Sequence, residues 1–301
     1  MTSTIETTTW GPLAEPIHDD AAGPGDPVWK DNAYLSFWDQ DNRVYGTFHV
    51  STSPNGDGAR RARCSVLLDA DGGTGRMIEI IEELPRGSFR SDSITFGLDG
   101  TITVDHPDLT ARLRNDPLHT PADYSTTGLI PELVPGRPLQ HFQQACTITG
   151  TFEAGGRTYP VDGHGMRDRT WGFRDERAQW AEYAGLVAVL DGVFVTAMKF
   201  LGTDGSLSAD GFVIDADGSH AITAMGFRRT AAAQFLRCTL TLDDASTRVV
   251  TLTSREAGFF VPMGVETDGP AFGTYDDFMA LDCDGSPGAG FFEQGIVHRV
   301  H

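Results

Sequence analysis

The sequence predicts an all-β protein with two antiparallel β-barrel or sandwich domains, and three observations support this class. Turn dipeptides, above all Asp-Gly, recur between short apolar and β-branched runs along the chain. Helical periodicity is almost absent, and even M-I-E-I-I-E-E-L lies between turn signals and favours a strand. An open sheet of so many strands would leave long edges exposed, and a chain of 301 residues is longer than one barrel needs.

The elements are expected in a simple order along the chain. Residues 17–29 are rich in Gly, Pro and Asp and form an extended arm, after which W-K-D-N-A-Y-L-S-F-W-D-Q-D-N begins the first strand. Residues 118–138 are rich in proline and form the expected linker. The two domains are therefore placed at residues 1–135 and 136–301. Hairpin turns are expected at Asp99, Gly155, Asp191, Asp217 and Ala245.

The charge balance excludes several classes of partner. The formal net charge is -19, so a phosphate backbone or an anionic bilayer surface would repel the protein, and we expect no nucleic-acid partner. The start of the chain has no basic or apolar signal region, and no run approaches the roughly 18 apolar residues of a membrane span. We expect a soluble cytoplasmic protein with no integral membrane segment, and its oligomeric state stays open.

Charged residues gather in one stretch, H-G-M-R-D-R-T-W-G-F-R-D at residues 164–175. Strand alternation places His164, Met166 and Asp168 on one face and Arg167 and Arg169 on the other. One interpretation is a structural cluster of ion pairs that joins two sheets. The other is a site in which these groups carry chemistry.

The second candidate cluster lies in the hairpin around Asp191-Gly192. A two-residue turn there puts Glu182 opposite Leu201 and diagonal to Lys199, at the open end of an otherwise apolar face. A carboxylate and an ammonium at the mouth of an apolar barrel could polarise a substrate. The opposite face, which carries Tyr183, is also apolar, so the sequence does not decide which face points inward.

Metal and nucleotide sites are not supported by the motifs. The four cysteines lie far apart, without the spacing of a zinc site, and they are expected to be isolated thiols. His49, His141 and His164 lie in strand-like segments but in no H-x-H or H-E-x-x-H pattern. The G-x-G-x-x-G patterns do not open a helix, so no nucleotide cofactor and no metal is expected.

Three segments resemble a known family. G-H-G-M-R-D-R-T-W-G-F-R-D is similar to the signature G-x-G-x-R-D-H-S-W-G-x-R-D of lipocalin-like two-barrel proteins related to carotenoid 1,2-hydratase (hydroxyneurosporene synthase). V-W-K-D-N-A-Y-L-S-F-W-D is similar to the family's opening, and G-A-G-F-F-E-Q-G to its closing segment. The family's His and Ser after R-D are Arg169 and Thr170 here, and its opening Glu is Asp31. Trp29 and Glu293 match more loosely.

The resemblance implies two lipocalin-like β domains, a hydrophobic tunnel within or between them, and acid-base chemistry on a polyene-like or terpenoid molecule without an external cofactor. We expect a hydratase, isomerase or cyclase in which Asp168 or Glu182 is the acid, because burial raises the pKa of a carboxyl. The other expected site residues are Arg167 and Arg174, which hold a carboxylate or a substrate oxygen, Trp171 and Trp180, whose rings stabilise a carbocation, and His164, Tyr183, Lys199 and Trp29 as substrate contacts.

Two other functions stay open. The first is a lipocalin-like carrier that binds a hydrophobic ligand without chemistry, with a purely structural Arg/Asp cluster. The second is a binding module for a partner protein, which the acidic surface permits.

Overall fold

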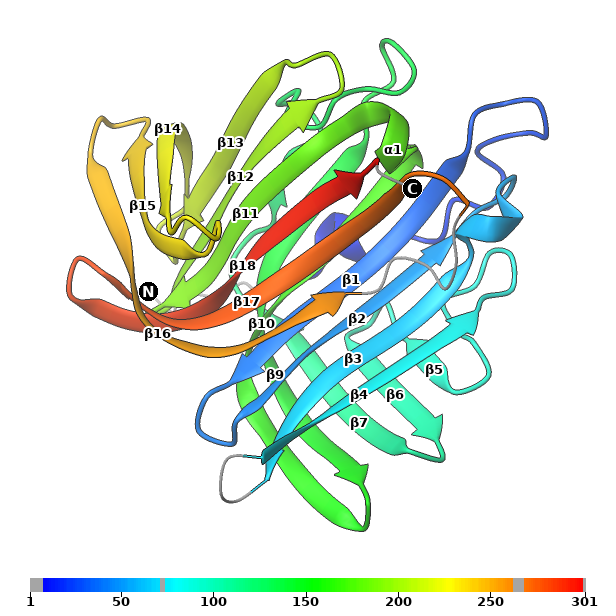
Figure 1. The fold of residues 1–301 in the computed structure, drawn as a ribbon, viewed down its shortest axis with the longest axis horizontal. Coiled ribbons are helices and arrows are strands. Elements are labelled where there is room, and N and C mark those ends of the chain that lie inside the picture. Colours follow the sequence, from blue (N-terminus) through cyan, green and yellow to red (C-terminus); the bar gives the residue numbers. More distant parts are fainter. Residues whose placement is uncertain (1–7, 71–73, 262–267, 300–301) are drawn as a thin grey trace, which may run out of the picture.

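Two bodies of antiparallel sheet lie side by side in the molecule (Figure 1). The computed structural model describes residues 8–70, 74–261 and 268–299. Nearly all of the regular structure is β, which confirms the predicted class. One body is a closed eight-stranded barrel and the other is a curled ten-stranded sheet, so only one of the two is a closed barrel.

The ten-stranded sheet comes from the first part of the chain. Its strand order is β4-β3-β2-β1-β10-β9-β7-β6-β5, and β8 pairs with β9 outside this path. Its elements are the 3-10 helices η1 (Gly11–Ala14) and η2 (Asp57–Ala59) and the strands β1 (Trp29–Asp39), β2 (Val44–Thr52), β3 (Arg61–Ala70), β4 (Thr74–Glu83), β5 (Ile94–Phe96), β6 (Thr101–His106), β7 (Leu109–Pro117), β8 (Ala122–Asp123), β9 (Gln140–Ala154) and β10 (Arg157–Phe173).

The barrel comes from the rest of the chain and closes by pairing its first strand with its last. One short helix, α1 (Glu176–Gln179), leads into it, and the Asp175 side chain caps this helix by accepting a hydrogen bond from the Arg177 amide. Its strands are β11 (Trp180–Leu190), β12 (Val193–Gly202), β13 (Leu207–Ile214), β14 (Ser219–Arg229), β15 (Phe235–Leu242), β16 (Thr247–Val261), β17 (Ala271–Cys283) and β18 (Ser286–His298).

The chain crosses between the two bodies later than expected. We placed the domain boundary at residues 135/136, but β9 and β10 belong to the first sheet, and the crossing lies between Phe173 and Trp180. The proline-rich stretch 118–138 is an excursion from β7 to β9 within one sheet. The physical reason is that β10 pairs with β1 along ten residues, a contact between distant segments that a local turn signal does not indicate.

The predicted hairpin at Asp191-Gly192 is present with the expected register. Asp191 and Gly192 have φ of 47° and 79°, as a type I′ turn requires, and Glu182 pairs with Leu201. The segment M-I-E-I-I-E-E-L lies within β4 and is a strand, as predicted. The register places alternate residues of β11 on opposite faces of the barrel wall.

Buried apolar residues form three clusters. One lies on the face of the first sheet that also contacts Trp10 and Leu13, in the segment that precedes the arm. A second fills the barrel interior, where Leu186 and Phe292 are fully buried. The third lies between the other face of the first sheet and the outer wall of the barrel. The residues of the first sheet at this third cluster thus meet the barrel directly.

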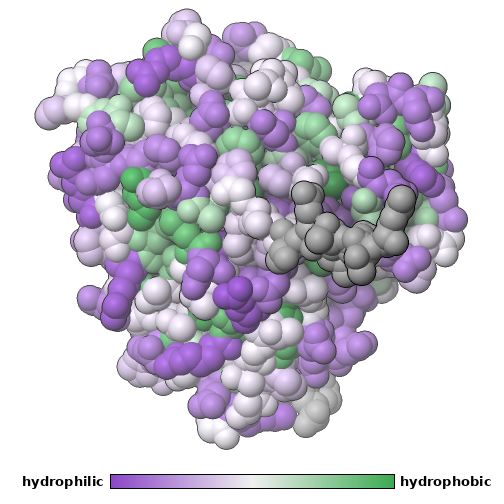
Figure 2. All heavy atoms as spheres, turned by 180° about the vertical axis from the view of Figure 1, so that it is seen from behind, coloured by the Kyte–Doolittle hydropathy of each residue, from purple (hydrophilic) through white to green (hydrophobic). Residues whose placement is uncertain are grey.

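The surface is mostly polar on the face in Figure 2, where hydrophobic side chains form separate areas between hydrophilic ones. Within the described residues, no helix has the length and apolar character needed to cross a bilayer. Cys64, Cys146, Cys238 and Cys283 are free thiols, as expected from their spacing.

Candidate functional site

A cavity of about 90 Å³ lies at the junction between the first sheet and the outer wall of the barrel. Both bodies contribute polar and aromatic side chains to its walls. The lining residues are Asn32, Tyr34, His49, Ile130, His141, Gln143, Met166, Asp168, Thr170, Arg174, Trp180, Tyr183, Met198, Phe200, Val261, Thr274 and Glu293.

A pair of buried carboxyls forms the barrel side of the site. Asp276 on β17 and Glu293 on β18 are direct partners across the two strands. Tyr34 donates its hydroxyl to Asp276 Oδ2 at 2.9 Å, and Tyr183 donates its hydroxyl to Glu293 Oε1. Because cross-strand partners lie on the same face, the two carboxyls share one buried environment. Glu293 lines the cavity, while Asp276 is fully buried beside it.

Burial changes the proton affinity of this pair. Burial raises the pKa of Glu293 to about 7, and the charge of Asp168 adds to this while the Tyr183 hydrogen bond and Arg174 oppose it. Burial and the negative charge of Glu293 raise the pKa of Asp276 well above its usual range. Two adjacent carboxylates in a dry site repel each other, so the pair keeps a proton at neutral pH. The pair therefore still carries a proton at pH 7.

A second polar group faces the cavity from the first sheet. Asp168 Oδ1 accepts a hydrogen bond from the Thr170 hydroxyl at 2.9 Å. His141 Nδ1 lies 2.7 Å from Thr170 Oγ1 and 3.4 Å from Asp168 Oδ2. Gln143 donates its amide to Asp168 Oδ2 at 3.4 Å and accepts a hydrogen bond from Thr196. Strands β9, β10 and β12 thus hold this group in place.

The surroundings of His141 favour one tautomer. Both neighbours of Nδ1 accept hydrogen bonds, so Nδ1 carries the proton and Nε2 carries the free lone pair. Nε2 is buried and has no hydrogen-bond partner among the residues that the structure describes. Burial lowers the pKa of His141, although the charge of Asp168 opposes this. His141 is therefore a neutral base next to a carboxylate.

Two arginines of the motif, the expected site residue Arg167 and its neighbour Arg169, lie away from the cavity. Arg167 is buried on the opposite face of β10, where it donates to Gly97 O and stacks 4.6 Å from the rings of Trp10 and Phe96. Arg169 lies on the same face and makes an ion pair with Asp31 at 2.8 Å. The alternation predicted for the motif is present, and Asp168 points to the cavity while its two arginine neighbours do not.

Several expected substrate contacts also lie elsewhere. Trp171 stacks on His18 with ring centroids 4.6 Å apart, in the cluster beneath the arm. Trp29 packs edge-on against Phe173 in the same cluster. His164 is exposed near the middle of β10. None of these three lines the cavity.

The expected Glu182–Lys199 pair lies on the inner face of the barrel. The Glu182 side chain is 42% exposed and makes an ion pair with Arg229 at 3.5 Å. Lys199 Nζ lies 5.8 Å from the centre of the Phe227 ring. Neither lines the cavity, because the site uses the outer face of the same hairpin. Tyr183, on that outer face, does line it.

Three of the other expected residues meet at the cavity. Asp168, Arg174 and Trp180 line it together with Tyr183. The Arg174 guanidinium lies 5.5 Å from the centre of the Trp180 ring and pairs with Glu176 at 2.9 Å. The expected motif therefore contributes one carboxylate and one arginine to the site.

Sequence reasoning did not single out Asp276, Tyr34 or Gln143 as site residues. One signal was present for Asp276, since a strand that reads T-Y-D-D-F-M-A-L places carboxyls inside an apolar run. Glu293 was matched only as the closing Glu of the resemblance, and His141 only as a histidine in a strand. In the described part of the chain, no group of three His, Cys, Asp or Glu side chains is arranged to hold a metal ion.

These features define a lipocalin-like protein of two β bodies with a polar cavity between them. Residues 15–296 match a family described as a domain of unknown function, DUF7064, and the chain belongs to that family. No curated protein matches the chain.

Solved structures with the same architecture cover almost the whole chain. A protein from Nitrosomonas europaea that carries the name AttH has 16% identity and a TM-score of 0.58, over 93% of this chain and 98% of its own. Kievitone hydratase from Nectria haematococca has 13% identity and a TM-score of 0.56, over 99% and 94%. CghA has 12% identity and a TM-score of 0.59, over 96% of both chains. These similarities confirm the lipocalin-like fold that the resemblance implied, and one of the neighbours is a hydratase.

Proposed function

We propose that the protein is a cofactor-independent hydratase, isomerase or cyclase that acts by acid-base chemistry on a hydrophobic, unsaturated small molecule, such as a terpenoid or a polyene. The observation that carries this proposal is Glu293, a buried carboxyl in the wall of the cavity whose pKa is raised to about 7. The presence of a hydratase among the structural neighbours is consistent with it.

Protonation of a carbon-carbon double bond needs an acid that keeps its proton at neutral pH. In the proposed reaction Glu293 gives its proton to one alkene carbon, and the other carbon becomes cationic. The indole of Trp180, which lines the cavity, stabilises this charge through its π face. The cation is then attacked by water, loses a proton from a neighbouring carbon, or is attacked by a second double bond. In the last case the new cation that forms loses a proton or is attacked by water in the same way.

The acceptor of the second proton is His141. Asp168 and Thr170 hold its Nδ1–H, so the Nε2 lone pair is free to take a proton from water or from carbon. The imidazolium that forms is stabilised by the Asp168 carboxylate. Exchange with water then returns the proton to Glu293 and closes the cycle.

The proposal is tested by turnover in deuterium oxide. The purified protein is incubated without added cofactor with a panel of unsaturated terpenoids and polyenes, and the products are analysed by mass spectrometry and NMR. We expect a product with solvent deuterium on carbon, because each of the three reactions begins with proton transfer to carbon. Binding of a panel member without any deuterium in carbon-hydrogen bonds would instead support the carrier function.

The Asp168→Asn variant is expected to lose about 10²-fold in turnover and to change in unfolding free energy by no more than about 1 kcal/mol. Asparagine removes the charge that stabilises the His141 imidazolium, while its amide can still bond to Thr170 and Gln143. Steady-state kinetics and thermal unfolding measure the two effects. A melting point lowered by many degrees would instead mean that Asp168 has a structural role.

The rate is expected to fall as the pH rises through about 7. The raised pKa means that Glu293 is protonated, and able to act as an acid, below that pH and ionised above it. The lowered pKa of His141 keeps this base neutral at pH 7 and above. A profile of kcat/KM between about pH 5 and 9 measures this limb. A rate that increases steadily with pH would contradict the role of Glu293.

A further inference from the structure

A second, larger chamber opens beside the cavity. Its volume is about 650 Å³, and it shares Asn32, His49, Arg174 and Val261 with the inner cavity. The inner cavity, at about 90 Å³, is much the smaller of the two. A substrate whose double bond reaches Glu293 can extend past the shared residues into the outer chamber.

The outer chamber is basic although the protein is strongly acidic. Five of its lining residues are basic, namely Lys30, Arg61, Arg63, Arg174 and Arg177. Among the lining residues that the structure describes, two are acidic, Asp175 and Glu176. The described part of the wall thus carries a net positive charge in a chain with a net charge of -19. The charge of the outer chamber is thus opposite in sign to the net charge of the protein.

A single carboxylate balances two of these cations. Glu176 contacts Lys30 at 2.6 Å and Arg174 at 2.9 Å. Burial would raise the pKa of Glu176, but Lys30 and Arg174 together lower it well below its usual range. Glu176 is thus ionised at neutral pH, and one unit of positive charge remains in this group of three.

Two polar side chains, Asn32 and His49, lie where the chambers meet. Asn32 is 2% exposed, and its Oδ1 atom has no hydrogen-bond partner within the described residues. Burial lowers the pKa of His49 well below its usual range, and the positive charges of Arg63 and Arg174 lower it further. His49 is therefore neutral at pH 7. Both side chains line both chambers and can form hydrogen bonds to a polar part of a ligand.

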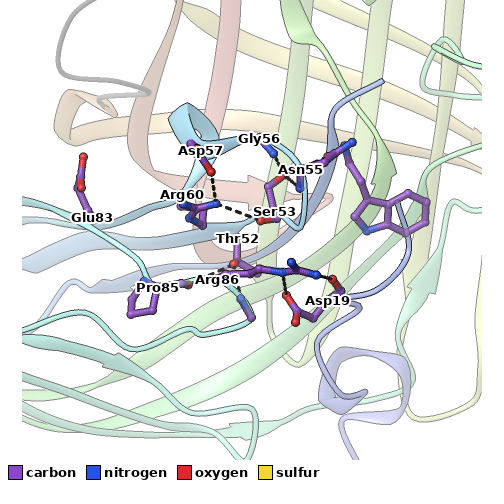
Figure 3. A network of polar contacts seen from close by, with 12 residues as sticks. Asp19, Thr52, Ser53, Asn55, Gly56, Asp57, Arg60, Glu83, Pro85 and Arg86 are labelled. Atoms are coloured by element: carbon purple, nitrogen blue, oxygen red, sulfur yellow. Dashed lines mark hydrogen bonds and ion pairs between the residues drawn. The ribbon is translucent and has the colours of Figure 1, made fainter. Parts of the chain in front are cut away.

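The rim of the chamber is held by a hydrogen-bonded loop after β2 (Figure 3). Ser53 Oγ accepts a hydrogen bond from the Gly56 amide at 2.8 Å, and Asn55 Oδ1 accepts one from the Trp29 amide at 3.0 Å. Asp57 and Arg60 form an ion pair at 2.8 Å. This loop leads into β3, which carries Arg61. These hydrogen bonds fix the loop that leads to Arg61 at the edge of the chamber.

We propose that the outer chamber binds the anionic head group, a carboxylate or a phosphate, of an amphipathic substrate whose apolar, unsaturated end occupies the inner cavity. The inference rests on the proposed function, since it names the class of substrate for that site. Guanidinium groups suit both anions because they donate paired hydrogen bonds to them.

The test measures binding and does not need turnover. The probes are geranic acid, methyl geranate and geranyl phosphate, and their dissociation constants are determined by isothermal titration calorimetry. We expect geranic acid or geranyl phosphate to bind at least about 10-fold more tightly than the uncharged ester. The tighter of the two identifies the head group. The advantage should shrink as sodium chloride increases from about 0.05 to 0.5 M, while the affinity of the ester stays constant.

A double variant identifies the residues responsible. Arg61→Gln combined with Arg177→Gln should reduce the affinity for the charged probe about 5-fold or more and leave the affinity for the ester unchanged. The matched control combines Arg112→Gln with Arg114→Gln, which removes the same charge from exposed arginines paired with Asp105 and Asp116 outside the chamber. It should not change either affinity.

Two results would overturn the inference. One is equal affinity for the charged and uncharged probes in the unmodified protein. The other is an equal loss of affinity in the chamber variant and in the control. Neither result affects the deuterium experiment, so the proposed reaction and the proposed substrate class can fail separately.

Discussion

The Glu293→Gln variant is expected to lose at least about 10³-fold in turnover, because removal of a general acid eliminates most of its catalytic contribution. Glutamine has the size of glutamate and can still accept the Tyr183 hydroxyl through its oxygen, so the cavity keeps its shape. The amide cannot give a proton to an alkene. We therefore expect a loss in kcat with little change in KM, measured by steady-state kinetics on the substrate identified by deuterium incorporation.

The same variant should fold at least as stably as the unmodified protein above pH 7. In the unmodified protein Glu293 must ionise in a buried site as the pH rises, where its charge raises the pKa of the neighbouring Asp276. A neutral glutamine removes this cost, so thermal unfolding at about pH 8 should give an equal or higher melting point. A lower melting point would mean that the loss of turnover has a structural cause.

Glu182→Gln is the matched comparison for Glu293→Gln. Glu182 lies on the neighbouring strand β11, is 42% exposed and pairs with Arg229 outside the cavity. The same chemical change there should leave turnover within about a factor of two, as expected for a surface residue. Loss of turnover in the Glu182 variant with full turnover in the Glu293 variant would reverse the assignment and place the acid on the inner face of the barrel.

The sequence predicts the local parts of this site well. The alternation of residues 164–170 separates Asp168 from Arg167 and Arg169, and the structure places them on the two faces of β10 as expected. The register of the Asp191-Gly192 hairpin is also local, since a two-residue turn determines which residues pair.

The carboxyl pair could not be predicted in the same way. Asp276 and Glu293 belong to one hairpin, but their burial depends on the first sheet, which packs against the outer wall of the barrel. Both faces of β11 are apolar because one lines the barrel interior and the other lies against this sheet. A sequence pattern therefore does not show which face meets the cavity. Tyr34, whose hydroxyl donates to Asp276, lies more than two hundred positions before it in the sequence.

Substitution of Arg169 by methionine is expected to reduce the free energy of unfolding by about 3–5 kcal/mol, because it leaves a buried carboxylate without its arginine partner. Arg169 and Asp31 are both fully buried and form two hydrogen bonds of 2.8 Å. Arg169 also donates to Glu15 O at 2.8 Å, and Asp31 accepts from the His18 amide at 2.9 Å. The pair thus fastens the arm to β1 and β10.

Denaturant unfolding measures this effect, and two variants give the comparison. Arg114→Met replaces an exposed arginine and should change the free energy of unfolding by less than about 0.5 kcal/mol. The double variant Asp31→Asn with Arg169→Met should recover part of the loss, because it removes the orphaned charge. A stable Arg169→Met protein would contradict a structural role for this pair.

The variants Arg169→Met and Asp168→Asn test two different roles in the charged motif, one in stability and one in turnover. Neighbouring residues on one strand face opposite sides, so Arg169 pairs with Asp31 beneath the arm, while Asp168 lies beside His141 at the cavity. Within the described parts of the chain, Asp168 has no arginine partner. We expect loss of stability from the first substitution and loss of turnover from the second. The structural and the chemical interpretations of the motif then both hold, each for one face of β10.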